Sequence, residues 1–389
     1  MNRDKPIPQA AEGRAGRRLL RWALVVLAVA AAVFVTAHHV LSRPQFGAPM
    51  STSELIRAQA NAHYRSDHFV NDLPPAAYRL ADIWTLLVGQ LFGDETRQPP
   101  AALPAVAVDR HALAAALPGS GLRAFWIGHA SVYVEIDGLR VLTDPMFSDY
   151  ASPFDFGPRR FQPPALTIDE LPVIDIVLIT HDHYDHLDMR SAQQLARRGA
   201  SFLVPLGIGA HLQRWGVPRA QIHELEWWQE YKLGAVRFIS TPARHYSGRG
   251  LTDASATLWT SWSVLGHKHR FFVSGDSGYS DHFSVIGERY GPFDLSFMKI
   301  GAYGPGAPWL DIHMSVEDAV RAHREVRARR LFPVHWGTFN LAFHDWDEPI
   351  RRAVQAANAS GVELLTPRLG EIVDADKALP LQAWWEAVR

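Results

Sequence analysis

The stretch that decides the fold is "THDHYDHLD", Thr180 to Asp188, which places three histidines and three aspartates within nine residues. It directly follows "VIDIVLI", Val173 to Ile179, an apolar run typical of a buried strand. Imidazoles and carboxylates crowded at a strand end repel or desolvate one another unless a cation lies between them. The stretch therefore predicts a metal-binding loop at the end of a strand.

The loop offers ligands for more than one ion. His181 and His183 are two residues apart and point the same way if the chain is extended there, whereas Asp185 and His186 need a turn to join them. Neutral imidazole and carboxylate oxygen both suit zinc, so one loop can serve two metals side by side. One loop rarely completes a coordination shell, and we expect further ligands at the ends of other strands.

Three later strands supply them. His245 follows a predicted strand in "FISTPARHYSGRG", Asp276 follows one in "RFFVSGDSGYS", and His335 follows one in "RLFPVHWGTFN". A lone histidine among the 19 of this chain is more often a surface or satisfied polar residue than a ligand. The dense loop at Thr180 raises the expectation for the whole set.

The composition sets limits on fold and partners. With 389 residues, 47% of them hydrophobic, the chain can bury a large core. Lys and Arg number 39 against 40 for Asp and Glu, so no broad positive field exists and nucleic acid is not an expected partner. Cys is absent, and any metal must be held by histidine and carboxylate.

The N-terminus is membrane-directed. Arg14, Arg17, Arg18 and Arg21 come shortly before "WALVVLAVAAAVFVTA", Trp22 to Ala37, an apolar run that residues 38–41 extend toward spanning length. Two interpretations of residues 1–42 stay open, an uncleaved signal anchor and a signal peptide cleaved after the small residues "VTA". Both predict an extracytoplasmic protein, either on the periplasmic side of a bacterial inner membrane or exported.

Residues 43–120 form a predicted Pro- and Ala-rich segment before the main domain, 121–389. Arg79 to Gly93 has the spacing of an amphipathic helix, with these apolar positions on one face: Leu80, Ile83, Trp84, Leu87, Leu91 and Phe92. We expect that face to cover the main domain. The alternative is a helix that contacts a membrane.

From Leu122 onward, short strands alternate with helical patterns, which predicts a layered α+β fold. "SVYVEID" alternates with the strand period and ends in a tight "DG" turn. The other expected strands are Val173 to Thr180, Phe202 to Pro205, Val236 to Ser240, Trp259 to Leu265, Arg270 to Ser274, Leu295 to Ile300 and Arg330 to Pro333. The expected helices are Arg190 to Arg198, Tyr279 to Tyr290, Ser315 to Val326 and Glu348 to Asn358.

The H-x-H-x-D-H run of Thr180 to Asp188 resembles the signature of the metallo-β-lactamase superfamily, which implies an αββα sandwich with two metals at one edge. Within it, an ordered set of segments from Leu122 to Glu371 resembles the N-acyl-phosphatidylethanolamine-hydrolysing phospholipase D family. The segments are "WIGHAS", "LTDPMFS", "GPRRF", "THDHYDHLD", "SWSVLG", "GDSGY", "GPFDL", "IGAY" and "VHWGTF".

The resemblance also implies the roles of site residues. It assigns one zinc ion to His181, His183 and His245, the other to Asp185, His186 and His335, and makes Asp276 the bridge between them. It further implies that Asp185 orients the nucleophile. His313 matches a histidine that donates to the substrate phosphate or to the leaving oxygen; an ordinary histidine at a helix start is the competing interpretation.

The implied reaction is hydrolysis of a membrane phospholipid, N-acyl-phosphatidylethanolamine, to N-acylethanolamine and phosphatidic acid by a water molecule that two Zn²⁺ ions activate. Iron or manganese would also suit histidine and carboxylate ligands. Two other functions stay open: a metal-dependent lactonase or other ester hydrolase, and a catalytically silent, metal-stabilised binding module. The sequence predicts no oligomeric state.

Overall fold

The computed structural model describes residues 12–74, 76–115, 121–377 and 381–388. The chain divides into two compact units, Met1–Phe46 and Gly47–Arg389. In the first unit, helix α1 (Glu12–Leu41) is followed by the short turn η1 (Pro44–Phe46). Within the described residues, Leu20–Leu41 is the one helical stretch long and apolar enough to cross a membrane, and a signal sequence would have the same properties. The N-terminal helix is therefore a candidate membrane segment.

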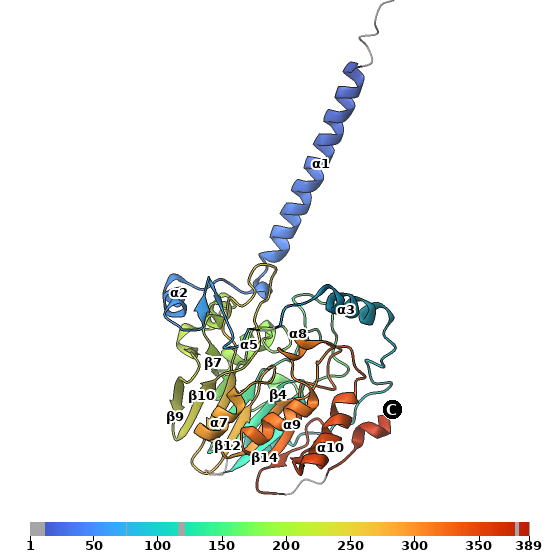
Figure 1. Cartoon of the computed structure of the whole chain (residues 1–389). Helices are drawn as coiled ribbons and strands as arrows, with labels where there is room; N and C mark the ends of the chain where they lie inside the picture. The colour runs from blue at the N-terminus through green and yellow to red at the C-terminus, as the bar shows by residue number, and fades with distance from the viewer. Residues whose placement is uncertain (1–11, 75, 116–120, 378–380, 389) are drawn as a thin grey trace, which may run out of the picture. The chain divides into compact units, whose positions relative to one another are not determined.

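Two seven-stranded mixed sheets make up the centre of the second unit (Figure 1). The first sheet has the strand order β16 (Val373–Asp374), β3 (Leu122–Gly128), β4 (Ser131–Ile136), β5 (Leu139–Thr143), β6 (Ile176–Leu178), β7 (Ser201–Pro205), β8 (Ile222–Leu225). The second has the order β15 (Glu363–Leu364), β14 (Ala328–Val334), β13 (Phe293–Lys299), β12 (Arg270–Val273), β11 (Ser261–Leu265), β10 (Val236–Thr241), β9 (Glu230–Leu233).

The alternation of side chains along the strands explains how the layers form. In β3, Ala124 and Trp126 join the core between the two sheets, whereas Phe125 and Ile127 join a separate core on the outer face of the first sheet. All four are buried. A strand that is apolar on both faces needs cover on both sides, so each sheet packs on the other sheet and on helices.

Helices supply the two outer layers. α5 (Met189–Arg197) and α6 (Ile208–Arg214) contribute apolar side chains to the core outside the first sheet. α7 (His282–Tyr290), α9 (Val316–Glu325) and α10 (Glu348–Ser360) lie together over the second sheet (Figure 1). The layers are therefore helix, sheet, sheet and helix, which confirms the predicted αββα sandwich.

Residues 47–115 belong to the same compact unit as the sandwich. They carry α2 (Thr52–Gln59), a small hairpin of β1 (Tyr64–Arg65) and β2 (His68–Phe69), α3 (Leu80–Phe92) and α4 (Arg110–Ala114). The remaining short elements are η2 (Ile168–Glu170), η3 (Arg219–Gln221), α8 (Ala307–Leu310) and η4 (Trp384–Val388). The domain boundaries at residues 42 and 120 stay predictions.

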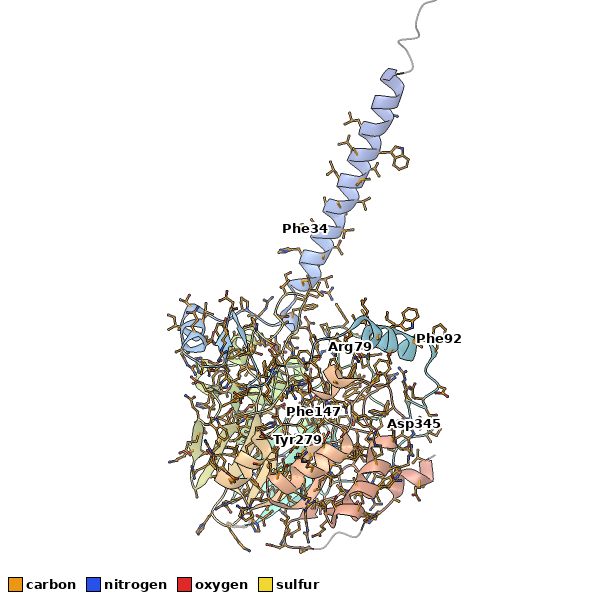
Figure 2. The ribbon with its side chains drawn as sticks, viewed as in Figure 1. Phe34, Arg79, Phe92, Phe147, Tyr279 and Asp345 are labelled. Carbon is orange, nitrogen blue, oxygen red and sulfur yellow. The ribbon has the colours of Figure 1, made fainter. Side chains whose placement is uncertain are left out.

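The helix predicted from Arg79 to Gly93 forms, but the expectation about its apolar face is wrong. Ile83, Trp84 and Leu87 are exposed instead of covering the main domain. Figure 2 shows the side chain of Phe92 at the end of α3, directed away from the body of the unit. The half-buried or buried positions of α3 are Asp82, Leu86 and Gly89, which are mostly small or polar. The less apolar side of the helix therefore faces inward.

Strand direction brings the polar strand ends to one edge of the sandwich. β5, β6 and β7 run parallel in the first sheet, and β12, β13 and β14 run parallel in the second. The carboxyl ends of parallel strands meet at the same edge of a sheet. The loops that follow β6, β12 and β14 carry six of the seven predicted metal ligands, and the seventh, His245, follows β10.

Candidate metal centre

The three aspartates of the Thr180–Asp188 loop have different roles. Asp182 is buried and holds the loop in place, accepting hydrogen bonds from the Gly248 amide at 2.8 Å and the Thr257 hydroxyl at 2.9 Å. Asp188 caps α5 by accepting from the first backbone amides of that helix. Asp185 faces the histidines. Only one of the three carboxylates is therefore a candidate ligand.

A buried arginine braces the same loop from outside. The guanidinium of Arg249 donates to the backbone carbonyls of Asp182 and Leu187. It also lies over the rings of Tyr184 and Trp215, at 4.1 Å and 5.0 Å from their centres. These contacts fix both ends of the turn that presents the histidines.

Three histidines form the first half of the centre. His183 Nδ1 lies 2.9 Å from His181 Nε2 and 3.3 Å from His245 Nε2. His245 Nδ1 lies 2.9 Å from the Ile312 carbonyl and donates to it, which leaves Nε2 to face the other two rings. The structure thus brings His245 to the loop, although 62 residues separate it from His183.

The second half is built around two carboxylates. Asp185 Oδ2 lies 3.3 Å from His335 Nε2 and 3.4 Å from His186 Nε2. Asp276 places Oδ1 3.5 Å from His186 Nε2 and Oδ2 3.1 Å from His335 Nε2. Possible ligand atoms of Asp276, His181 and His186 lie within 4.8 Å of one another, so Asp276 lies between the two halves. All seven predicted ligands come together.

His129 belongs to the second half, and the sequence analysis did not assign it. Its Nε2 lies 2.9 Å from Asp185 Oδ2, and its backbone carbonyl accepts from the His335 amide at 3.0 Å. The signal was present in "WIGHAS", since His129 directly follows β3 as the other candidates follow their strands. His129 is thus positioned to hold Asp185. Its ring also offers a possible metal ligand in addition to those of Asp185, His186 and His335.

Asp144 lies behind the centre. It is fully buried, and its Oδ2 accepts from His186 Nδ1 at 2.8 Å and from the Thr180 hydroxyl at 2.7 Å. Because Nδ1 of His186 donates to this carboxylate, Nε2 is directed at Asp185 and Asp276. Asp144 therefore supports the metal centre through His186 and Thr180.

His313 reaches the centre from the segment between α8 and α9. Its Nδ1 lies 3.5 Å from Asp276 Oδ2, and its ring stands 5.0 Å from that of His245. Possible ligand atoms of His313, Asp276 and His245 lie within 4.8 Å of one another. His313 therefore adjoins the predicted bridge instead of sitting at a helix start remote from the site.

Two glycines allow the strand ends to approach this closely. Gly275 adopts a φ of +56°, and a Cβ there would stand 2.8 Å from Thr180 Cβ. A Cβ on Gly301 would stand 2.0 Å from the His335 carbonyl oxygen. Side chains at these positions would push the Asp276 and His335 segments away from the loop.

The unpaired atoms of the cluster fit a bound cation. His186 Nε2, Asp276 Oδ1, His313 Nδ1 and His335 Nε2 are buried and lack a hydrogen-bond partner among the residues that the structure describes. Buried polar groups are normally paired, and each unpaired one is costly. Nitrogen and oxygen donors that converge without sulfur are a donor set that zinc, iron and manganese accept. The residues present therefore fit divalent metal.

Charge within the cluster points the same way. Burial alone would raise the pKa of Asp276, but His335 and His186 outweigh burial and hold it well below its usual range. Burial alone would lower the pKa of His186, yet Asp276, Asp185 and Asp144 raise it well above its usual value. The carboxylates thus require positive charge beside them, and cations would supply it when the histidines are neutral.

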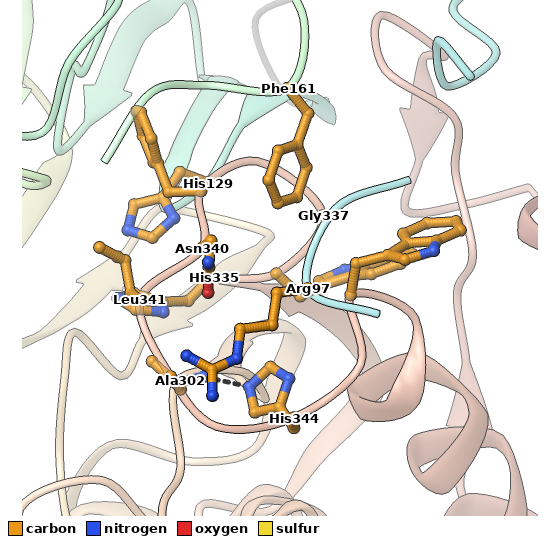
Figure 3. A pocket seen from close by; sticks show the side chains of 13 residues that line it. Arg97, His129, Phe161, Ala302, His335, Gly337, Asn340, Leu341 and His344 are labelled. Atoms are coloured by element: carbon orange, nitrogen blue, oxygen red, sulfur yellow. Dashed lines mark hydrogen bonds between the residues drawn. The ribbon is translucent and has the colours of Figure 1, made fainter. Parts of the chain in front are cut away.

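A pocket opens next to the second half of the centre. Its lining includes His129 and His335 together with Arg97, Phe339 and His344. Figure 3 shows His129 and His344 at opposite ends of this pocket, and His344 Nε2 accepts from the Ala302 amide at 3.1 Å. Polar and aromatic groups therefore surround this space beside His129 and His335.

A family model described as the beta-lactamase superfamily domain matches residues 139–336, a range that contains the Thr180 loop, His245, Asp276 and His335. The chain belongs to the metallo-β-lactamase superfamily. This confirms the family resemblance of the Thr180–Asp188 motif.

The proteins similar to this chain match different fractions of its length. A protein of Mycobacterium tuberculosis, described as uncharacterized, is 41% identical over 95% of this chain and 99% of its own length. The N-acyl-phosphatidylethanolamine-hydrolyzing phospholipase D 1 of Caenorhabditis elegans is 35% identical over 66% of this chain and 76% of its own. The solved structure of a metallo hydrolase from Ignicoccus hospitalis has a TM-score of 0.52 at 22% identity, covering 66% of this chain and 98% of that one.

This member of the metallo-β-lactamase superfamily is accordingly a metal-dependent hydrolase that resembles N-acyl-phosphatidylethanolamine-hydrolysing phospholipase D. The superfamily fold implies divalent metal, and the clustered histidines and aspartates described above are the residues that could hold it.

Proposed function

We propose that the chain is a phosphodiesterase of the phospholipase D type that holds two zinc ions and hydrolyses N-acyl-phosphatidylethanolamine to N-acylethanolamine and phosphatidic acid. The observation that carries the proposal is the convergence of seven donor side chains from four chain segments, with unpaired atoms facing one another. The similarity to the relative of Caenorhabditis elegans supports the lipid substrate.

His181, His183 and His245 would hold one ion, and Asp185, His186 and His335 the other, with Asp276 shared between them. Two bound cations would supply a lowered pKa for an attacking water molecule and would stabilise charge on a phosphoryl oxygen. The donor set contains no sulfur, which suits zinc but leaves iron and manganese as chemical alternatives.

The chain's own residues orient the reaction. Asp185 would accept a proton or hydrogen bond from the attacking water, because its Oδ2 is held in the cluster by His129 at 2.9 Å. The water oxygen forms a bond to phosphorus, and the bond from phosphorus to the oxygen of N-acylethanolamine breaks. A proton ends on that leaving oxygen. His313, whose Nδ1 is buried and unpaired among the described residues, would donate to the phosphate or to the leaving oxygen.

The site of action follows from the N-terminal segment. We propose that α1 is retained as an anchor or removed as a signal peptide, and that the second unit works outside the cytoplasm on the periplasmic side of a bacterial inner membrane or after export. The apolar stretch Leu20–Leu41 and the arginines before it support this placement.

The test combines metal analysis with a lipid assay. We expect about two zinc ions per wild-type chain and release of phosphatidic acid from N-acyl-phosphatidylethanolamine. Asp276→Asn should lose bound metal and lose activity by at least ~100-fold, since the shared carboxylate is weakened as a ligand. Asp281→Asn is the matched control, because Asp281 is exposed and makes no side-chain cap.

An acyl lactone assayed beside the phospholipid separates the alternatives. Lactone turnover without phosphatidic acid would replace the proposal by a lactonase. Bound metal without turnover of either compound would indicate the silent binding module.

A further inference from the structure

Helix α3 carries an exposed apolar face that the described part of the second unit does not cover. Among the described residues of Gly47–Arg389, sixteen large hydrophobic side chains are exposed, and seven of these lie between Tyr78 and Phe92. Leu80 is 86% exposed, Trp84 68% and Phe92 78%. Such concentration on one short segment differs from the scattered apolar residues of an ordinary soluble surface.

The exposed positions share one side of the helix. They are Leu80, Ile83, Trp84, Leu87, Val88 and Phe92, which we call the α3 face. Spacings of three, four and seven residues place them on a single broad stripe. The opposite side holds Asp82, Leu86 and Gly89, which are less exposed. The charged residue within α3, Asp82, lies on that opposite side and accepts from Arg79 at 3.0 Å, and Arg79, which precedes the helix, is exposed.

The inner side of α3 is fixed to loops that carry site residues. A Cβ on Gly89 would stand 3.2 Å from the Phe343 ring, and Arg97 donates to the Gly89 carbonyl at 2.6 Å. Phe343 packs on Trp309, whose ring lies 6.1 Å from that of His313. Phe343 also lies in the chain segment that follows His335. α3 is therefore held beside the candidate metal centre with its apolar face outward.

We propose that the α3 face inserts into the surface of a lipid bilayer and keeps the loops that carry His313 and His335 next to the lipid. Trp, Phe and aliphatic side chains on an uncharged helix face are typical of helices that lie in a membrane interface. The same chain contains the candidate membrane segment Leu20–Leu41, so a bilayer is the partner that the chain itself points to. The proposal goes beyond the proposed function, because it holds whichever ester the centre hydrolyses.

The absence of Cys allows a direct test on the full chain. Trp84→Cys gives a single thiol for an environment-sensitive fluorophore, and the protein is reconstituted into vesicles of phosphatidylcholine and phosphatidylethanolamine. Nitroxide-labelled lipids then report whether the label is within the lipid. The matched control is Val173→Cys, which is 58% exposed and precedes β6, at the opposite end of that strand from the Thr180 loop.

We expect strong quenching at position 84 and none at position 173. Leu87→Cys should repeat the result at position 84, whereas Leu86→Cys on the inner side should be quenched much less, which gives a helical pattern that misfolding would not produce. Equal, weak quenching at positions 84 and 173 would overturn the proposal. Disulfide-linked dimers of Trp84→Cys, with the label shielded from nitroxide lipid, would overturn it in favour of a second copy of the chain. Neither readout needs turnover, so a failed lipid assay would leave this test intact.

Discussion

His186 Nδ1 lies 2.8 Å from Asp144 Oδ2, and the two side chains are completely buried. Asp144 follows β5 and His186 follows β6, so the contact joins the ends of two paired parallel strands. The same carboxylate accepts from the Thr180 backbone amide at 2.8 Å. One aspartate thereby sets both the position of the loop and the tautomer of a candidate ligand.

Asp144→Asn should weaken metal binding without removing any proposed ligand. An amide cannot stabilise the His186 ring as a carboxylate does, and loss of such a supporting partner typically lowers metal affinity by ~10–100-fold. Competition with a chelator of known affinity measures the change. Asp149→Asn, an exposed aspartate of the following loop, serves as the control and should bind metal as the wild type does. Equal affinity in both variants would contradict the supporting role.

Arg249→Met should destabilise the folded chain and loosen the centre. The substitution keeps much of the apolar volume but removes the donors to the carbonyls of Asp182 and Leu187. Leaving buried carbonyls unpaired costs ~1–3 kcal/mol each, so for two carbonyls we expect the free energy of unfolding to fall by ~2–6 kcal/mol. Urea unfolding of metal-free protein measures it.

The control for Arg249 is Arg237→Met, which removes an exposed ion pair with Glu230. Exposed pairs contribute ~0–1 kcal/mol, and this variant should unfold close to the wild type. A similar loss in both variants would show that Arg249 braces nothing specific.

The folded chain should lose stability in mild acid because the ring of His323 is protonated more readily when the chain unfolds. His323 is distant in sequence from the Thr180–Asp188 loop. Burial, assisted by Arg324, lowers the pKa of His323 to about 4, and its Nδ1 lies 2.7 Å from the Ser296 hydroxyl. The unfolded chain protonates this ring near pH 6.5, whereas the folded chain resists until about pH 4. Stability is therefore full above pH 6.5 and falls as pH decreases toward 4.

The contribution of His323 between pH 7 and pH 5 is at most ~2 kcal/mol. His323→Asn keeps a polar group near Ser296 but does not titrate, so its free energy of unfolding should fall less than that of the wild type over this range. Urea unfolding of both proteins at pH 7 and pH 5 gives the difference, in which other titrating groups cancel. Parallel losses in the two proteins would refute the assignment.

Local patterns in the sequence predicted a layered α+β fold and most of the strand ends, whereas the αββα order was implied by the family resemblance. The strand expected from Arg270 to Ser274 is β12, Arg270–Val273, and the polar residues after it mark the site edge. The helix expected from Arg190 to Arg198 is α5, Met189–Arg197. Apolar periodicity and strand-end chemistry are properties of neighbouring residues, and they survive folding.

The rest of the site depends on contacts between distant segments. Asp182 and Asp185 have the same chemistry in the sequence, yet only the folded chain places Asp182 against Gly248 and Asp185 against His129. The outward face of α3 was likewise unpredictable, since its spacing equally suits a helix that covers a core. Which side of an amphipathic helix is buried is decided by the surfaces around it.

The central claim is that distant residues hold a pair of cations, and anomalous X-ray diffraction from zinc-loaded crystals tests it most directly. The account predicts two peaks per chain, one ~2.0–2.1 Å from the ring nitrogens of His181, His183 and His245 and one at similar distances from His186 and His335, with Asp276 between the peaks. A single peak, or zinc bound away from these side chains, would contradict it.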